Sequence, residues 1–162
     1  MNTIPIQTKS LKLILRTPAE VRAQIDTLDA AALAELSPEW LALLHASDAS
    51  DPWIHGFAIV DRTGEALIGT CGFKAPPTDG VVEIAYGIDA GHQGKGFATE
   101  AAEALTTYAF ASGRVRLVRA HTQPESNAST RVLIKCGYRF AGEVVDPQDG
   151  PVWRWERTNE VA

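Results

Sequence analysis

A glycine-dense turn between a strand and a helix constrains this chain more than any other segment. Residues 87–100 read GIDAGHQGKGFATE. An apolar strand ends at Ile88, and an amphipathic helix begins near Phe97. A helix start leaves about four backbone N–H groups unpaired, and a Ser, Thr, Asp or Asn side chain usually caps one of them. Residues 93–96 offer no such side chain, so we expect a bound anion to complete this helix start.

The composition of the same turn predicts a cradle for a pyrophosphate. Its glycines let the backbone approach an anion closely, and Lys95 adds positive charge. The P-loop pattern fails because Phe97 and Ala98 follow Gly96 where Lys and Ser/Thr are required. The dinucleotide pattern fails because Thr99 stands in place of its last small residue. The remaining alternative is a flexible connection with a solvated lysine.

The hydrophobic patterning elsewhere predicts an α/β fold with both antiparallel and parallel strand pairs. Two helices are expected within residues 18–48, the second restarting at Ser37-Pro38, and two more at 97–112 and 128–135. About seven strands are expected, at residues 11–16, 53–60, 66–73, 81–88, 115–120, 138–145 and 152–156. A chain of 162 residues fits one ordinary domain, so residues 1–162 are expected to form a single domain.

Charge and cysteine usage exclude several classes of partner. The formal net charge of −5 disfavours nucleic acid, which binds through Lys and Arg. Cys71 and Cys136 stand alone and far apart, so we expect buried thiols and no metal site. Neither a signal peptide nor an apolar run long enough for a membrane span occurs, which predicts a soluble, cytoplasmic protein with no membrane partner.

Two segments resemble the GNAT superfamily of N-acetyltransferases. QGKGFA at residues 93–98 resembles the Gln/Arg-x-x-Gly-x-Gly/Ala signature that cradles the pyrophosphate of acetyl-CoA in this family. PESNASTRVLIKCGY at residues 124–138 resembles the family's second cofactor segment. The opening LKLILR and the spacing from Ser129 to Gly137 are most similar to the branch that acetylates the N-terminal alanine of ribosomal proteins.

This resemblance implies a mixed, partly antiparallel twisted sheet with helices on both faces and two splayed central parallel strands, at 81–88 and 115–120. Pantetheine would lie between these strands, with the acetyl carbonyl near residues 84–86 and polarised by a backbone N–H. Acetyl-CoA would be the co-substrate, and the implied cofactor-binding residues are Ile88, Gln93, Gly94, Lys95, Gly96, Phe97, Ala98, Thr99 and Asn127.

Direct attack on the thioester requires a neutral amine, so a proton acceptor is needed. Glu83, on the strand expected beside the thioester, is the candidate base, acting directly or through a water. The alternative is a solvated glutamate that faces away from the cleft, because alternation alone does not show which strand face meets it. His55 and His121 are weaker candidates, since nothing in the sequence pairs either one with a carboxylate.

The leaving thiolate needs a proton or a hydrogen bond. Many relatives use a tyrosine seven residues beyond the Asn of the second segment, but here Ile134 occupies that position. Ser129 matches the serine of the N-terminal acetylating branch and is the substitute candidate, with simple helix capping as its alternative. Asn127 is expected to contact the pantetheine amide, although it too could only cap the helix, and the family's Asn could instead align with Ser126.

The acceptor is less constrained. Trp53, His55 and Phe57 would share one face of a strand beside the acceptor cleft, which makes them candidate substrate-binding residues, although an aromatic face is more often core. The expected activity is acetyl transfer to a primary amine, either a protein N-terminus or a small-molecule amine such as an antibiotic or polyamine. The alternative from another class is a non-catalytic acyl-CoA-binding sensor. Monomer and homodimer both remain open.

Overall fold

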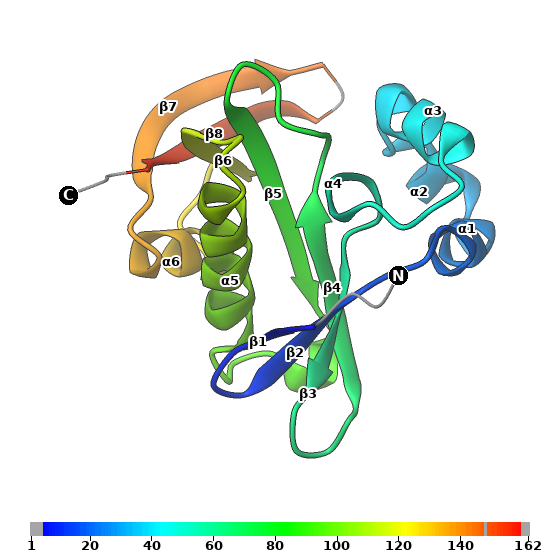
Figure 1. Ribbon diagram of the computed structural model, residues 1–162. Coiled ribbons are helices and arrows are strands. Elements are labelled where there is room, and N and C mark those ends of the chain that lie inside the picture. The colour runs from blue at the N-terminus through cyan, green and yellow to red at the C-terminus, as the bar shows by residue number, and fades with distance from the viewer. Residues whose placement is uncertain (1–4, 148, 160–162) are drawn as a thin grey trace.

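An eight-stranded sheet with one long helix against it dominates the computed structural model shown in Figure 1, which describes residues 5–147 and 149–159. The strands are β1 (Ile6–Gln7), β2 (Leu11–Leu15), β3 (Phe57–Asp61), β4 (Leu67–Phe73), β5 (Val81–Ile88), β6 (Leu117–Thr122), β7 (Arg139–Asp146) and β8 (Gly150–Thr158). The helices are α1 (Pro18–Asp26), α2 (Ala30–Ala34), α3 (Pro38–Ala46), α4 (Pro52–His55), a short 3₁₀ turn (Ala90–His92), α5 (Phe97–Ala111) and α6 (Ala128–Lys135).

The strand order is β1-β2-β3-β4-β5-β6-β8-β7, with one parallel pair, β5–β6. This confirms the mixed, partly antiparallel α/β class. The count of about seven strands is one short because β1, only two residues long, carries too little alternation to be recognised. The chain turns between β7 and β8 near residues 146–150, of which Gln148 is outside the described residues.

The strand predicted to begin at Trp53 is wrong in its first four residues. Pro52 to His55 form helix α4, and the strand begins at Phe57. Asp51 caps this helix by accepting a hydrogen bond from the Trp53 N–H at 2.8 Å, and Pro52 occupies its first turn. Gly56 ends the helix with φ +65°, a conformation that favours glycine. The Asp-Pro start signal therefore outweighed the alternating apolar pattern.

The N-terminal helical segment holds three helices rather than the expected two. Thr17 caps α1 in a capping box with Glu20, and Ser37 caps α3, as their sequence signals predict. The additional helix α2 is only five residues long and starts at Asp29, whose side chain accepts a bond from the Ala32 N–H. Its shortness is the reason that sequence patterning does not separate it from its neighbours.

The parallel strands β5 and β6 separate along their length. Three pairs join them, Val81–Leu117, Val82–Val118 and Glu83–Arg119. Beyond Glu83, β5 continues to Ile88 paired only with β4, while β6 continues to Thr122 paired only with β8. The splayed central pair is thus present, and the edge of β5 from Ile84 to Ile88 is not paired with β6.

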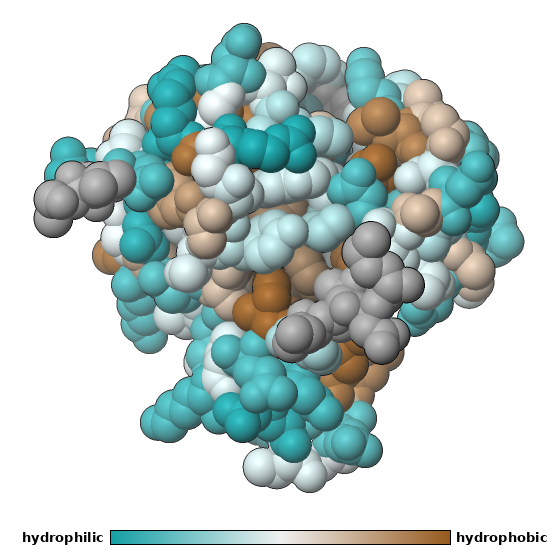
Figure 2. Space-filling view, in the orientation of Figure 1, coloured by the Kyte–Doolittle hydropathy of each residue, from teal (hydrophilic) through white to brown (hydrophobic). Residues whose placement is uncertain are grey.

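Helix α5 packs against one face of the sheet and buries Ala101, Ala102, Leu105 and Ala109 there. Aromatic rings from α4, β3 and β4 gather around Tyr108 of this helix. The centroid of the Tyr108 ring lies 5.6 Å from that of Trp53, 5.9 Å from that of Phe57 and 6.0 Å from that of Phe73. In Figure 2, the hydrophobic residues that reach the surface gather around α3 and beside β1, and more hydrophilic surface surrounds them. Among the described residues, no helix has the length and apolar character needed to cross a bilayer.

Gly69 lets β4 pass close to the end of β5, and its substitution provides a test of this packing. A Cβ at Gly69 would lie 2.1 Å from the Gly87 carbonyl oxygen, which is backbone and cannot rotate away. We expect Gly69→Ala to lower the free energy of unfolding by about 1–3 kcal/mol, measured by urea denaturation. Gly64→Ala is the matched control, because its Cβ would come no closer than 3.9 Å to another atom. Equal stability of the two variants would contradict the described strand contact.

Candidate functional site

The turn before α5 has the features of an anion cradle. Gly96 is the N-cap of α5 in the left-handed conformation (φ +82°), and no side chain caps the helix. Gly94 is also left-handed (φ +80°). The Gln93 side-chain amide donates to the Ile88 carbonyl at 2.9 Å and ties the turn to the end of β5. The first backbone N–H groups of α5 therefore remain available for an anion, as the sequence predicts.

A cavity of about 480 Å³ opens next to this turn. It is bounded by the end of β5, the start of α5 and the first turns of α6. Most of the predicted cofactor-binding residues line it: Ile88, Gln93, Gly94, Gly96, Phe97, Ala98 and Thr99. Lys95 and Asn127 are not among its lining residues. We call this space the donor cavity.

The two candidates on the second cofactor segment have different positions. Asn127 is the N-cap of α6: its side chain accepts from the Thr130 N–H at 3.1 Å within a capping box. Ser129 does not cap; it is exposed in the first turn of α6 and lines the donor cavity. The capping interpretation therefore applies to Asn127, and Ser129 has a hydroxyl that is free of that role.

Glu83 lies in a chain of polar contacts on the sheet face opposite α5. Its Oε2 atom lies 2.9 Å from His121 Nδ1 and 3.1 Å from Lys74 Nζ. The other ring nitrogen of His121 accepts a bond from Arg154 Nε at 3.1 Å. Because Nε2 is an acceptor, the proton of neutral His121 sits on Nδ1 and is donated to Glu83. The structure thus pairs His121 with a carboxylate, a contact that nothing in the sequence indicates.

The surroundings of Glu83 keep it ionised. Burial acts to raise the pKa of this carboxyl group, but the hydrogen bond from His121 and the charge of Lys74 outweigh burial, so the pKa is lowered overall. Glu83 is therefore a carboxylate at neutral pH, and it can act as a weak base that exchanges protons through water.

A second cavity, of about 280 Å³, lies on the opposite side of β5 from the cradle. Small residues line it: Gly56, which ends α4, Gly72 of β4 and Ala85 of β5. Helix α3 contributes Trp40, whose Nε1 donates to the Ile54 carbonyl at 2.8 Å. This space, which we call the acceptor cavity, shares Tyr86 and Gly87 with the donor cavity.

Of the three predicted substrate-binding residues, His55 lines the acceptor cavity and Trp53 and Phe57 do not. Trp53 and Phe57 are buried in the hydrophobic core beside Tyr108. His55 is fully buried but lines the acceptor cavity, and its Nε2 atom has no hydrogen-bond partner. Burial lowers the pKa of His55, which favours the neutral ring.

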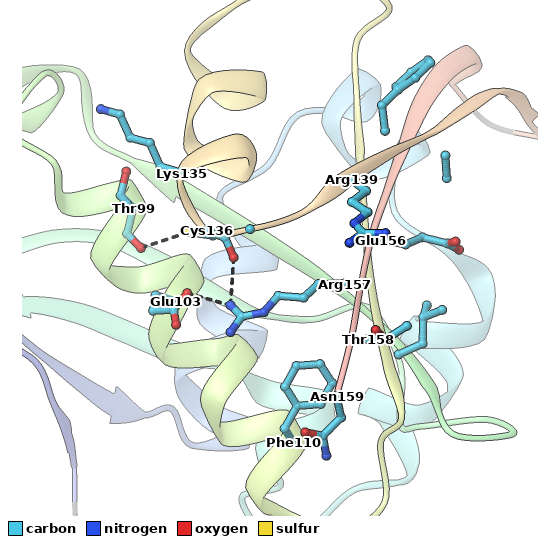
Figure 3. Close-up of a pocket in the computed structure, with 14 residues that line it drawn as sticks. Thr99, Glu103, Phe110, Lys135, Cys136, Arg139, Glu156, Arg157, Thr158 and Asn159 are labelled. Carbon is cyan, nitrogen blue, oxygen red and sulfur yellow. Dashed lines mark hydrogen bonds and ion pairs between the residues drawn. The ribbon is translucent and has the colours of Figure 1, made fainter. Parts of the chain in front are cut away.

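A third and larger cavity, of about 910 Å³, lies between α5, the end of α6 and strands β7 and β8 (Figure 3). Arg157 crosses it and donates from Nη1 to Glu103 and to the Cys136 carbonyl, both at 2.8 Å. Of the predicted site residues, only Thr99 reaches it. Its volume alone therefore does not make it the site. Within the described part of the chain, no group of three or more His, Cys, Asp or Glu side chains is placed to hold a metal ion.

The profile of the acetyltransferase (GNAT) domain matches residues 12–139, which include the cradle, Glu83, His121 and the start of α6. The chain belongs to the GNAT acetyltransferase family. Among GNAT relatives, an uncharacterised N-acetyltransferase, p20 of Bacillus licheniformis, is 34% identical over 91 residues, or 56% of this chain. The match covers 51% of that protein, so the chain spans about half of its relative's length.

Solved GNAT structures share the fold over nearly the whole chain. The ribosomal-protein-S5-alanine acetyltransferase from Vibrio fischeri superposes with a TM-score of 0.70 at 17% identity and covers 98% of both chains. AAC(6′)-Ib in complex with ribostamycin and coenzyme A superposes with a TM-score of 0.64 at 20% identity and covers 93% of this chain and 94% of its own. At these identities the likeness concerns the fold.

Sequence reasoning missed two sets of groups. His121, the partner of Glu83, and Arg154 behind it line neither the donor nor the acceptor cavity, whereas Arg16 and Trp40 line the acceptor cavity. Strand alternation could have placed Glu83 and His121 on exposed faces of neighbouring parallel strands. It could not supply the register between those strands, which decides whether the two side chains meet.

The Glu83 contacts predict a pH-dependent stability effect. Because its pKa in the folded state lies below the ordinary value of 4.5, Glu83 stabilises the fold above that pH, and this contribution disappears as the pH falls through the lowered pKa. We expect Glu83→Gln to lower the free energy of unfolding by about 1–3 kcal/mol at pH 7. At acid pH the variant should approach wild-type stability. Denaturant titrations across pH measure this. Exposed Glu125→Gln is the control, and a loss for Glu83→Gln that does not shrink at acid pH would contradict the ion-pair account.

Proposed function

We propose that this chain transfers an acetyl group from acetyl-CoA to a primary amine. The observation that carries this proposal is the meeting of the donor and acceptor cavities at Tyr86 and Gly87, where β5 has separated from β6. A thioester held along this free strand edge would be open to an amine from the other side. Membership in the GNAT family supports the same donor.

On the donor side, the N–H groups at the start of α5 would bind the pyrophosphate, and the free edge of β5 would hold the pantetheine amides. A backbone N–H near Tyr86 would polarise the acetyl carbonyl. Gly94 and Gly96 matter here through their left-handed backbone and the absence of a side chain in front of the N–H groups. Asn127 would support this arrangement by starting α6 at the right place.

The amine nitrogen would attack the thioester carbonyl carbon, the C–S bond would break, and CoA would leave as a thiolate. Glu83 lies two residues before Ala85 on the same strand face, about 7 Å along β5. It would therefore take the ammonium proton through water rather than directly. Ser129, exposed to the donor cavity, would donate a hydrogen bond to the departing sulfur.

Three alternatives can be distinguished by assays of CoA release: acetylation of a protein N-terminus, acetylation of a small-molecule amine, and binding of acetyl-CoA without turnover. Solved structures of similar fold include a ribosomal-protein acetyltransferase and an aminoglycoside-bound enzyme, so a protein N-terminus and a small-molecule amine both remain candidates. A sensor would bind acetyl-CoA but release no CoA with any amine. The pairing of Glu83 with His121 and the exposed Ser129 support turnover over sensing.

Binding of acetyl-CoA tests the cradle first. Calorimetric titration of the wild type is expected to show binding in the micromolar range. Gly94→Glu/Gly96→Glu should abolish it, because two carboxylates would repel the pyrophosphate and both residues would be forced into a left-handed backbone. Absence of binding by a folded wild-type protein would overturn the proposal at its root.

Turnover tests the base. In a thiol-release assay with a panel of primary amines, Glu83→Gln is expected to lower kcat/KM by about 10²-fold or more while acetyl-CoA binding is kept. Glu103→Gln is the matched control and should retain activity. Glu103 is on α5, pairs with Arg157 and lines the third cavity. Equal activity of the two variants would remove Glu83 from the mechanism without affecting the donor assignment.

A further inference from the structure

The acceptor cavity carries positive charge and no carboxylate. Its fifteen lining residues, all of them described, include Arg16 and Lys74 but no Asp or Glu. Lys74 pairs with Glu83 at 3.1 Å, outside the lining, so its charge is already balanced and the charge that matters here is that of Arg16. This contrasts with the chain as a whole, which has a net charge of −5. A site that selects a polycation would be expected to present carboxylates to it. The charge therefore favours an acceptor that carries an anionic group of its own.

His55, which lines the same cavity, has an unused hydrogen-bond donor. The Asp51 N–H donates to His55 Nδ1 at 2.9 Å, so Nδ1 is an acceptor and the proton of the neutral ring sits on Nε2. Nε2 is buried and has no partner. Since buried polar groups are nearly always hydrogen-bonded, this N–H points to a ligand that brings an acceptor atom.

Arg16 lies beside His55 and is held in place by the protein. Its Nε donates to the His55 carbonyl at 2.9 Å, and Nη1 donates to Gln24. These bonds use two of the five N–H donors of the guanidinium, so the remaining donors can serve a planar anion. Glu20 is a carboxylate whose charge acts on Arg16, but it is exposed, accepts a hydrogen bond from the Thr17 N–H and does not line the cavity.

The dimensions of the cavity limit the acceptor to a small group. Its volume of about 280 Å³ lies below the ~300–1,000 Å³ of sites for drug-sized ligands. Gly56, beside Arg16, is separated from Ala85 by strand β4, so the two lie about 10 Å apart at the usual strand spacing. The contact of the anion near Gly56 and the contact of the amine near Ala85 would together occupy much of this distance. An amine and an anion separated by a few carbon atoms would fit.

We propose that the acceptor is an amine that carries a carboxylate a few bonds away, with the carboxylate bound by Arg16 and the His55 Nε2–H and the amine directed to Tyr86 and Gly87. This inference rests on the proposed acetyl transfer and specifies its acceptor. The carboxylate can come from a free amino acid or from an acidic first residue of a peptide, since both present the same chemistry to the cavity. Polyamines and aminoglycosides are excluded as preferred acceptors.

Matched amines test this directly. Glycine, β-alanine and γ-aminobutyrate are compared with their amides in the thiol-release assay, together with spermidine. Because a neighbouring carboxylate raises the pKa of an amine, fixed pH favours the amides chemically, and a preference for the acids must come from the site. We expect at least one acid to exceed its amide by about tenfold or more in kcat/KM, as a charge-assisted hydrogen bond allows. A peptide beginning with Glu and its twin beginning with Gln distinguish the two sources.

Substitution of Arg16 tests whether the preference for acids over amides comes from the acceptor cavity. Arg16→Gln should reduce the ratio of acid to amide toward one, and Arg16→Lys should restore part of it. Arg116→Gln is the matched control, because Arg116 is exposed, also donates from Nε to a backbone carbonyl, and lines neither cavity. The wild-type ratio decides the proposal even if Arg16 variants fold poorly. Amides or spermidine used as well as or better than every acid would overturn it.

Binding separates failure of this inference from failure of the proposed function. Each probe is titrated by calorimetry into protein saturated with CoA, which cannot react. If no amine is acetylated but an acid still binds more tightly than its amide, the acceptor inference stands and the turnover proposal falls. If neither acid nor peptide binds in preference to its neutral twin, the acceptor inference is overturned whatever the turnover.

Discussion

The loss of pairing between two parallel strands is the constraint on which the rest of this structure depends. β5 and β6 hold three residue pairs and then diverge, each still bound along its other edge, β5 to β4 and β6 to β8. An unpaired strand edge inside a domain leaves backbone donors and acceptors without partners. In a GNAT protein that edge is where the donor can lie, and both cavities meet on it at Tyr86 and Gly87.

The charged groups differ between the two sides of this strand edge. On the donor side, the positive end of α5 and its uncapped N–H groups favour a pyrophosphate. On the acceptor side, His121 connects Glu83 to Arg154 and fixes which nitrogen carries the proton. Glu83 is held ionised by these contacts, so it has a stable charge before any acceptor arrives. The acceptor would therefore enter a cavity lined by Arg16, with the already ionised Glu83 beyond the lining.

The sequence specified the donor side better than the acceptor side, for a physical reason. The cradle is local: Gln93, Gly94 and Gly96 act through backbone conformation and a helix end, which neighbouring residues determine. The acceptor cavity combines Arg16, which follows β2, with residues from α3, α4, β4 and β5, so its composition depends on register and packing that no single segment encodes. His55 illustrates this. Alternation placed it on a strand, but Asp51 and Gly56 made it the last residue of a buried helix.

Backbone amide hydrogen exchange, with and without acetyl-CoA, tests the central claim most directly because it reports on the strand edge itself. The account predicts that acetyl-CoA slows exchange in two separate places, at residues 97–99 of the cradle and at residues 85–88 of β5. Protection at both would show that one ligand spans the helix start and the free strand edge. Protection at the cradle with none along β5, or protection only in the large cavity between α5 and β8, would contradict the account.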